Sequence, residues 1–189
     1  MSYELGTNLK RIETPLSDPL VQDLRAGDSV LLSGVVYTAR DAAHARLVEL
    51  IRQGEPLPFD LAGQVVYYVG PTPAKPGRVI GSAGPTTSGR MDSFTPYLLA
   101  AGLKGMIGKG QRSQAVIDAI REHKAVYFAA TGGAAALLAK KIVSCDVIAY
   151  DDLGCEAIHR LEVVDLPLVV INDCEGRDFY RESQARYAR

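Results

Sequence analysis

The chain has 189 residues, 47% of them hydrophobic and 23% charged, which is the composition of an ordinary globular protein with one sizeable core. A formal net charge of −1 provides no overall field to attract nucleic acid or a membrane surface. The three cysteines, Cys145, Cys155 and Cys174, contain no CxxC pair, which disfavours a self-contained zinc or iron–sulfur site. Their wide spacing, an N-terminus without a signal pattern and the lack of a membrane-length apolar run predict a cytoplasmic protein.

The first half of the sequence predicts strands and turns around one helix. We expect an irregular N-terminal arm over residues 1–28, where prolines interrupt any regular pattern. The β-branched run at 29–39 predicts a strand that bends at Gly34, and residues 41–54 predict a helix that a glycine ends. Two further strands are expected, at 64–71 and at 78–83.

The second half alternates helices with strands, which predicts an α/β layered fold with a mixed or partly closed sheet and flanking helices. We expect a single domain over residues 29–180, followed by a C-terminal tail over 181–189. The expected helices lie within 91–104, at 113–124 with Ser113 as the N-cap, and within 131–142. The expected strands lie at 105–110, 125–130 and 146–152, with one or two more within 161–173.

Three glycine-containing loops share one design. GPTTSGR at 84–90, GKGQRS at 108–113 and ATGGAA at 130–135 each follow a short apolar strand and precede a helix. The carboxyl ends of parallel strands line the crevice of α/β sheets, so these loops are expected to meet there. Glycine lets the backbone approach a ligand closely, and a helix N-terminus offers free N–H groups. The pattern therefore predicts an anion-binding site.

A nucleotide phosphate is the less suitable anion. Gly84 and Gly89 have the spacing of a phosphate-binding P-loop, but Arg90 and Met91 stand where lysine and Ser/Thr are required, and Pro85 removes a backbone donor. The sequence also lacks a GxGxxG motif, so a dinucleotide site has no support.

A small dicarboxylate suits the cations at the strand ends better. Arg40, Arg90, Lys109 and Arg112 all lie beside the expected turns. Arginine offers a planar fork that matches a carboxylate, and lysine adds a point charge. The alternative is that these are solvated surface cations, as most isolated arginines and lysines are.

Few residues are suited to acid–base chemistry. His44 lies one turn into the first expected helix, where it either donates to a ligand or packs locally. The adjacent pair Asp151 and Asp152 follows a strand and is compatible with a metal ion or with an ordinary turn. No Ser–His–Asp arrangement is readable, so the residues alone predict carboxylate binding and provide no electrophile.

Five segments in order resemble the β-type, or C-terminal, portion of the iron–sulfur-dependent hydro-lyases, a family that contains the class I fumarases and L(+)-tartrate dehydratase. The segments are TARDAAH at 38–44, GPTTSGRMD at 84–92, KGQRS at 109–113, TGGAAALLAKKI at 131–142 and LGCEAIHRLEV at 153–163. The resemblance covers about residues 25–179 and implies a swivelling β/β/α domain. It also implies a hetero-oligomer whose α subunit carries a [4Fe–4S] cluster with one open iron, while this chain binds no cofactor or metal itself.

The resemblance also implies roles for individual residues. Thr86 would be the catalytic base, Thr87 would hydrogen-bond the substrate, and Arg40, Arg90 and Lys109 would bind its carboxylates. The sequence departs from the family pattern by Ser88 in place of alanine, Gln111 in place of asparagine and Cys155 in place of methionine.

The implied reaction is the reversible hydration of fumarate to (S)-malate, with this chain as the β subunit and active only with its α subunit. Dehydration of L(+)-tartrate to oxaloacetate is the alternative within the family. Two other classes stay open: a non-catalytic module that binds a small carboxylate without a partner, and a purely structural domain of a larger assembly.

Overall fold

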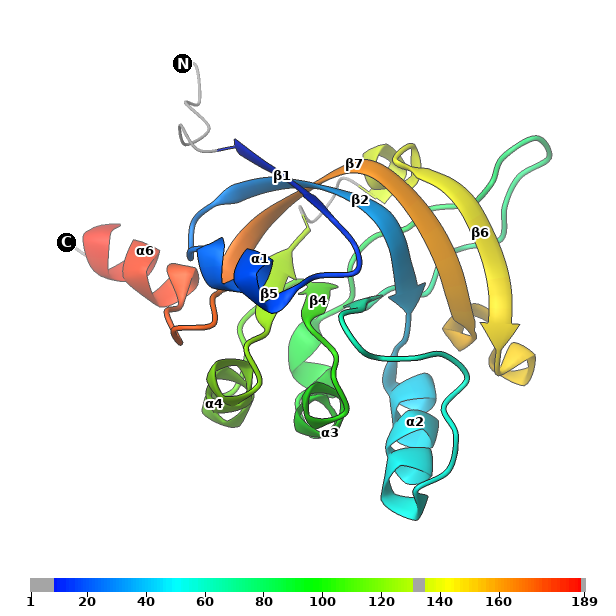
Figure 1. Cartoon of the computed structure of the whole chain (residues 1–189). Coiled ribbons are helices and arrows are strands. Elements are labelled where there is room, and N and C mark those ends of the chain that lie inside the picture. The colour runs from blue at the N-terminus through cyan, green and yellow to red at the C-terminus, as the bar shows by residue number, and fades with distance from the viewer. Residues whose placement is uncertain (1–8, 131–134, 188–189) are drawn as a thin grey trace.

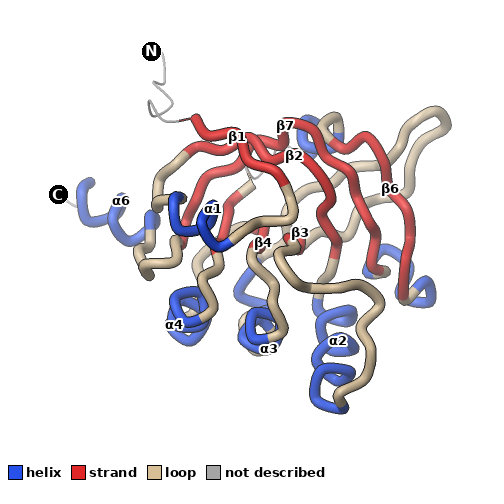
Figure 2. Tube along the Cα trace, viewed as in Figure 1, coloured by secondary structure: helices blue, strands red, loops and turns tan. Residues whose placement is uncertain are grey.

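In the computed structural model, which describes residues 9–130 and 135–187, a mixed sheet occupies the centre of the chain (Figures 1 and 2). Its strands are β1 (Leu9–Glu13), β2 (Ser29–Thr38), β3 (Val65–Tyr67), β4 (Gly105–Gly108), β5 (Val126–Ala129), β6 (Ile142–Ala149) and β7 (Ile158–Asn172). The α-helices are α1 (Asp18–Asp23), α2 (Asp41–Gln53), α3 (Thr95–Ala100), α4 (Gln114–Glu122), α5 (Ala135–Ala139) and α6 (Phe179–Tyr187), with 3₁₀ turns η1 (Ser88–Met91) and η2 (Asp151–Glu156). The expected mixed sheet with flanking helices is confirmed.

The sheet closes on itself because two long strands each have three neighbours. Strand β2 pairs in parallel with β1 and then with β3 along one side, and antiparallel with β7 along the other. Strands β3, β4 and β5 are parallel, and β5 joins β7, which completes a ring of five strands. Strand β6 pairs with β7 and extends the sheet outward. The register of β2 against β7 shifts beside Gly34, at φ 104°, so the predicted bend is present.

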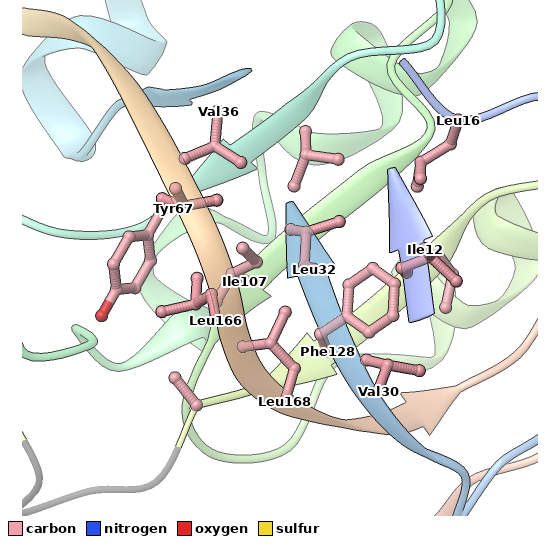
Figure 3. Packing of buried hydrophobic residues seen from close by; sticks show 14 of the residues in the cluster. Ile12, Leu16, Val30, Leu32, Val36, Tyr67, Ile107, Phe128, Leu166 and Leu168 are labelled. Atoms are coloured by element: carbon pink, nitrogen blue, oxygen red, sulfur yellow. The ribbon is translucent and has the colours of Figure 1, made fainter. Parts of the chain in front are cut away.

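Two apolar cores lie on the two faces of this sheet, and strand alternation divides the residues between them. Along β5, Val126 and Phe128 point into the inner core, and Tyr127 points toward the helices. Figure 3 shows the inner core, in which Ile12, Leu32, Phe128 and their neighbours pack within the curved sheet. Helices α2, α3 and α4 lie together on the other face (Figure 1) and bury the second core.

Local sequence signals explain the helix ends. Ser113 caps α4, where its hydroxyl accepts a hydrogen bond from the Val116 N–H at 3.4 Å, as predicted. Helix α2 ends at Gly54 in the left-handed conformation, at φ 69°. In the part of the chain that the structure describes, every helix falls short of the length and apolar character that a membrane span needs.

Three expectations about secondary structure were wrong. Residues 78–83 form a loop, because two prolines and two glycines flank their short apolar run and the segment protrudes from the sheet. The arm expected to be irregular contains β1 and α1, since β2 provides a pairing edge that the local sequence does not reveal. The expected C-terminal tail contains most of α6. Residues 161–173 belong to the single strand β7, which extends to Asn172.

Candidate active site

The Thr86 loop, residues 84–90, lies between the carboxyl ends of β3 and β4. The Thr86 N–H donates to the Tyr68 carbonyl at 2.7 Å, and the Lys109 N–H donates to the Thr86 carbonyl at 3.2 Å. The Ser88 N–H donates to the Lys109 carbonyl at 2.9 Å, and Thr87 and Lys109 form a parallel bridge. Two of the predicted glycine loops are therefore hydrogen-bonded together, which fixes the backbone of both threonines and of Lys109.

Arg40 lies where β2 passes into α2. It is the N-cap residue of α2 in an extended conformation and provides no side-chain cap. Glu156 of η2 replaces that cap, because its Oε2 accepts from the Ala42 N–H at 3.2 Å while its Oε1 lies 3.3 Å from Nη2 of Arg40. The Arg40 side chain is 20% exposed, and its buried Nε has no partner among the described residues. One buried donor of this guanidinium is thus unsatisfied by the described residues.

Gly70, just beyond β3, makes room for this arginine. A Cβ atom at Gly70 would lie 2.6 Å from Nη1 of Arg40 and 3.1 Å from the Cys155 carbonyl oxygen. Any larger residue at this position would displace the guanidinium or η2. Sequence reasoning did not identify Gly70 as part of the site.

Arg90 is held by the first turn of α2. Its Nε donates to Oδ1 of Asp41 at 3.0 Å, and its Nη2 lies 2.9 Å from Oδ2 of the same carboxylate. Arg90 is half exposed, so the pair is open to solvent on one side. Because Asp41 directly follows Arg40, the pair brings the two predicted carboxylate-binding arginines to one end of the sheet.

His44 is a packing residue that also fixes the backbone of Arg40. Its ring is buried against Tyr68 and Phe94, and its Nδ1 lies 2.9 Å from the Arg40 carbonyl oxygen. Since a carbonyl only accepts, Nδ1 carries the proton. Burial lowers the pKa of His44 to about 4, so the ring is neutral near neutral pH. Of the two interpretations of His44, the structure supports local packing.

Arg112 does not belong with the other cations, contrary to expectation. Its side chain is buried between the rings of Tyr68 and Tyr127, with its Cζ 5.3 and 5.0 Å from their centroids. Its Nε donates to Asp92 at 2.7 Å and its Nη2 to Thr95 at 2.7 Å. A guanidinium so fully engaged stabilises the loop and helix α3 and is not available to a ligand.

Lys109 is exposed at the end of β4 and makes no ion pair with any residue in 9–130 or 135–187. The side chains of Thr86 and Thr87 likewise have no hydrogen-bond partner within those ranges. The third predicted glycine loop falls largely on residues 131–134, which lie outside the described residues. Its far end approaches the Thr86 loop, since a Cβ atom at Gly84 would lie 2.9 Å from Cβ of Ala135.

The described residues contain no group of three or more His, Cys, Asp or Glu side chains that fits a metal ion. Cys145 is half-buried in β6, Cys155 is exposed in η2 and Cys174 is buried, so they do not form a cluster-binding set. Asp152 forms an ion pair with Arg46 of α2, which supports the ordinary structural interpretation of the 151–152 pair.

Comparison with known proteins identifies the family. The family model described as "Fumarase C-terminus" matches residues 6–183. The chain belongs to the fumarase C-terminus family. The L(+)-tartrate dehydratase subunit beta of Escherichia coli (strain K12) is 33% identical over 184 residues, which are 95% of this chain and 90% of that protein.

Longer proteins also contain this family region. "Fumarate hydratase class I, aerobic" of Escherichia coli (strain K12) is 43% identical over 155 residues, and "Fumarate hydratase 2" of Leishmania major is 40% identical over 163 residues. These matches cover 81% and 84% of this chain but only 28% of either relative. The chain therefore spans little more than a quarter of the fumarate hydratases that it matches.

The structure brings Arg40, Thr86, Thr87, Arg90 and Lys109 onto adjoining loops at one end of the sheet. Sequence reasoning missed the carboxylates that orient the two arginines. The position of Asp41 beside Arg40 was a weak signal for one of them, whereas no sequence signal linked Glu156 to Arg40.

Proposed function

We propose that this chain provides the carboxylate-binding and proton-transfer half of an iron–sulfur hydro-lyase that interconverts fumarate and (S)-malate. The observation that carries the proposal is the hydrogen-bonded pairing of the Thr86 and Lys109 loops beside Arg40 and Arg90. Three cations at one end of the sheet match a small ligand with two carboxylates. The family membership and the names of the relatives support the same reaction.

In this proposal each group has a defined task. Arg40, Arg90 and Lys109 bind the substrate carboxylates and stabilise the charge that accumulates on one of them when the neighbouring carbon loses its proton. In the malate-to-fumarate direction, Thr86 Oγ1 acts as an alkoxide, which the neighbouring cations favour, and becomes a hydroxyl when it takes that proton. The C–O bond of the substrate then breaks, and the departing hydroxide takes a proton from solvent to become water. Hydration of fumarate reverses these steps. The Thr86 backbone is fixed by its bonds to Tyr68 and Lys109, which supports precise positioning of the hydroxyl.

The second half of the site belongs, in this proposal, to an α chain. A [4Fe–4S] cluster on that chain would supply the Lewis acid for the substrate hydroxyl, because the described residues here do not fit a cluster. We also propose that the domain is of the swivelling β/β/α type and that the two chains form a cytoplasmic hetero-oligomer. The near-complete overlap with a relative named as a beta subunit supports a separate partner.

Dehydration of L(+)-tartrate to oxaloacetate is the second candidate reaction. It is favoured by the same relative, of which this chain covers 90%. Rates of the purified αβ complex on malate and on L(+)-tartrate decide between the two substrates. A higher kcat/KM for tartrate would replace the first candidate by the second.

The role of Arg90 is tested by Arg90→Lys in the αβ complex. Lysine retains the charge but loses the planar fork, so we expect kcat/KM to fall on the order of 10- to 100-fold. Arg177→Lys is the matched control, because Arg177 also contacts a carboxylate through Nε and Nη2, at 2.9 and 2.7 Å from Glu182. Equal kinetics for the two variants would remove Arg90 from the site.

A further inference from the structure

Most of the exposed large apolar residues lie on a few neighbouring segments of the chain. Of the eight large apolar residues that are exposed among the described ones, six lie on the 72–82 loop, α5, β6 and the paired strand β7. Single exposed apolar residues are ordinary, but a gathered set marks an interaction surface. We call this set the β6 surface; its members are Val79, Leu137, Val143, Val147, Ile148 and Val164.

These segments adjoin one another. A cavity of about 540 Å³ lies between the 72–82 loop on one side and α5 with the start of β6 on the other. The Val164 N–H donates to the Lys141 carbonyl at 2.9 Å, which joins the middle of β7 to the residues between α5 and β6. Among the described strands β6 pairs only with β7, which leaves its outer edge without a described partner (Figure 1). An exposed apolar edge strand favours association with another polypeptide.

The cavity in this surface is basic. Lys75, Arg78 and Lys140 line it, together with apolar and small polar residues, and none of the described residues in its lining carries a carboxylate. The acidic residue on the strand itself, Asp146, lies outside that lining. An occupant with apolar side chains and at least one carboxylate would complement the surface, whereas a second copy that placed this cavity against itself would oppose cations to cations.

The β6 surface is continuous with the candidate active site. The 72–82 loop leads directly into the Thr86 loop, and the Ala83 N–H donates to the carbonyl of Ala135 at the start of α5 at 3.4 Å. Helix α5 therefore adjoins the loop that a polypeptide completing the site has to approach. This continuity favours the chain that completes the site over an unrelated occupant.

We propose that the β6 surface is the docking site for the cluster-bearing α chain, which contacts it through an apolar segment that carries carboxylates. The proposal rests on the proposed function, because it takes the α chain as the partner. It assigns the exposed side chains of the 72–82 loop and α5 a task in assembly, beyond the packing of Ile80 and Leu138 into the inner core.

The test measures the affinity of the α chain for variants of the full chain by calorimetry or sedimentation. Leu137→Asp and Lys140→Glu are both expected to weaken binding at least about tenfold, and raising the ionic strength is expected to weaken binding of the unaltered chain. Leu9→Asp is the matched control, because Leu9 is 60% exposed, much like Leu137 at 63%, but lies on β1 at the opposite edge of the sheet. Thermal unfolding of each isolated variant verifies that it is folded.

Equal affinities for the three variants and the unaltered chain would overturn the proposal. A chain that dimerises alone, and loses its dimer through Leu137→Asp while still binding the α chain normally, would assign the surface to a second copy instead. Activity is measured separately: a complex that depends on this surface but turns over no diacid would contradict the proposed function and leave the docking site in place.

Discussion

The Asp41→Asn variant tests whether Asp41 holds Arg90 in position for the reaction, because its effect on the kinetics can be compared with its effect on the stability of the fold. The Asp41–Arg90 pair is half exposed, so its loss should cost about 0–1 kcal/mol, with up to about 1 kcal/mol more for the negative charge lost from the first turn of α2. For a domain of this size the melting temperature should fall by less than about 8 °C. Asparagine keeps the shape but gives up the ionic contacts that fix both Nε and Nη2 of Arg90.

The kinetic effect should be larger than the stability effect. A guanidinium displaced by about 1 Å can cost on the order of 100-fold in rate, so we expect kcat/KM of the αβ complex to fall on the order of 10- to 100-fold. Asp152→Asn is the control, since it breaks the ion pair between Asp152 of η2 and Arg46 of α2 and leaves the Asp41–Arg90 pair in place.

A double-mutant cycle tests the reasoning directly. If Asp41 acts through Arg90, Asp41→Asn should cause little further loss in an Arg90→Ala background. Full additivity of the two losses, or an Asp41→Asn complex with the kinetics of Asp152→Asn, would refute the positioning role.

Three further predictions concern the scaffold beneath the site. The free energy of unfolding should decrease as the pH falls from about 6.5 toward 4, because His44 binds a proton in the unfolded chain but stays neutral in the fold. The contribution of His44 to this decrease is on the order of 3 kcal/mol. Urea titrations of the His44→Gln variant should therefore show a weaker dependence of this free energy on pH. Arg112→Met should destabilise the chain by about 3 kcal/mol or more in urea, since Asp92 loses its buried partner; a loss within error of zero would contradict that role. Ser88→Ala should cost about 1 kcal/mol by removing the 2.8 Å contact with Tyr127 while kcat stays unchanged, and a large fall in kcat would place Ser88 in the mechanism.

Local sequence patterns were sufficient to predict some of the strands and helices. Strand β2, helix α2 with its terminal Gly54, and the Ser113 cap of α4 all follow from periodicity and end residues. Strand β1 could not be predicted in this way, because its Lys10 and Arg11 obscure the alternation and its pairing edge comes from β2. The apolar run at 78–83 suggested a strand for the opposite reason: its local pattern suits a strand, but no strand in the described part of the chain pairs with it.

The same distinction applies to the candidate site. Loops that follow parallel strands meet at one edge of a sheet, and this rule predicts from the sequence that Arg40, Arg90 and Lys109 lie near one another. The burial of Arg112 depends on Tyr68, just after β3, and on Tyr127 of β5, which no local pattern encodes. The pairing of Arg40 with Glu156 likewise joins residues more than a hundred positions apart.

The most direct measurement is fumarate formation from (S)-malate by this chain purified anaerobically together with its α chain. The proposed function predicts a rise in fumarate absorbance when both chains are present and none with either chain alone, and Thr86→Ala should abolish most of the rise. An intact, iron-loaded complex that turns over malate equally well with Thr86→Ala would contradict the assignment of proton transfer to this chain.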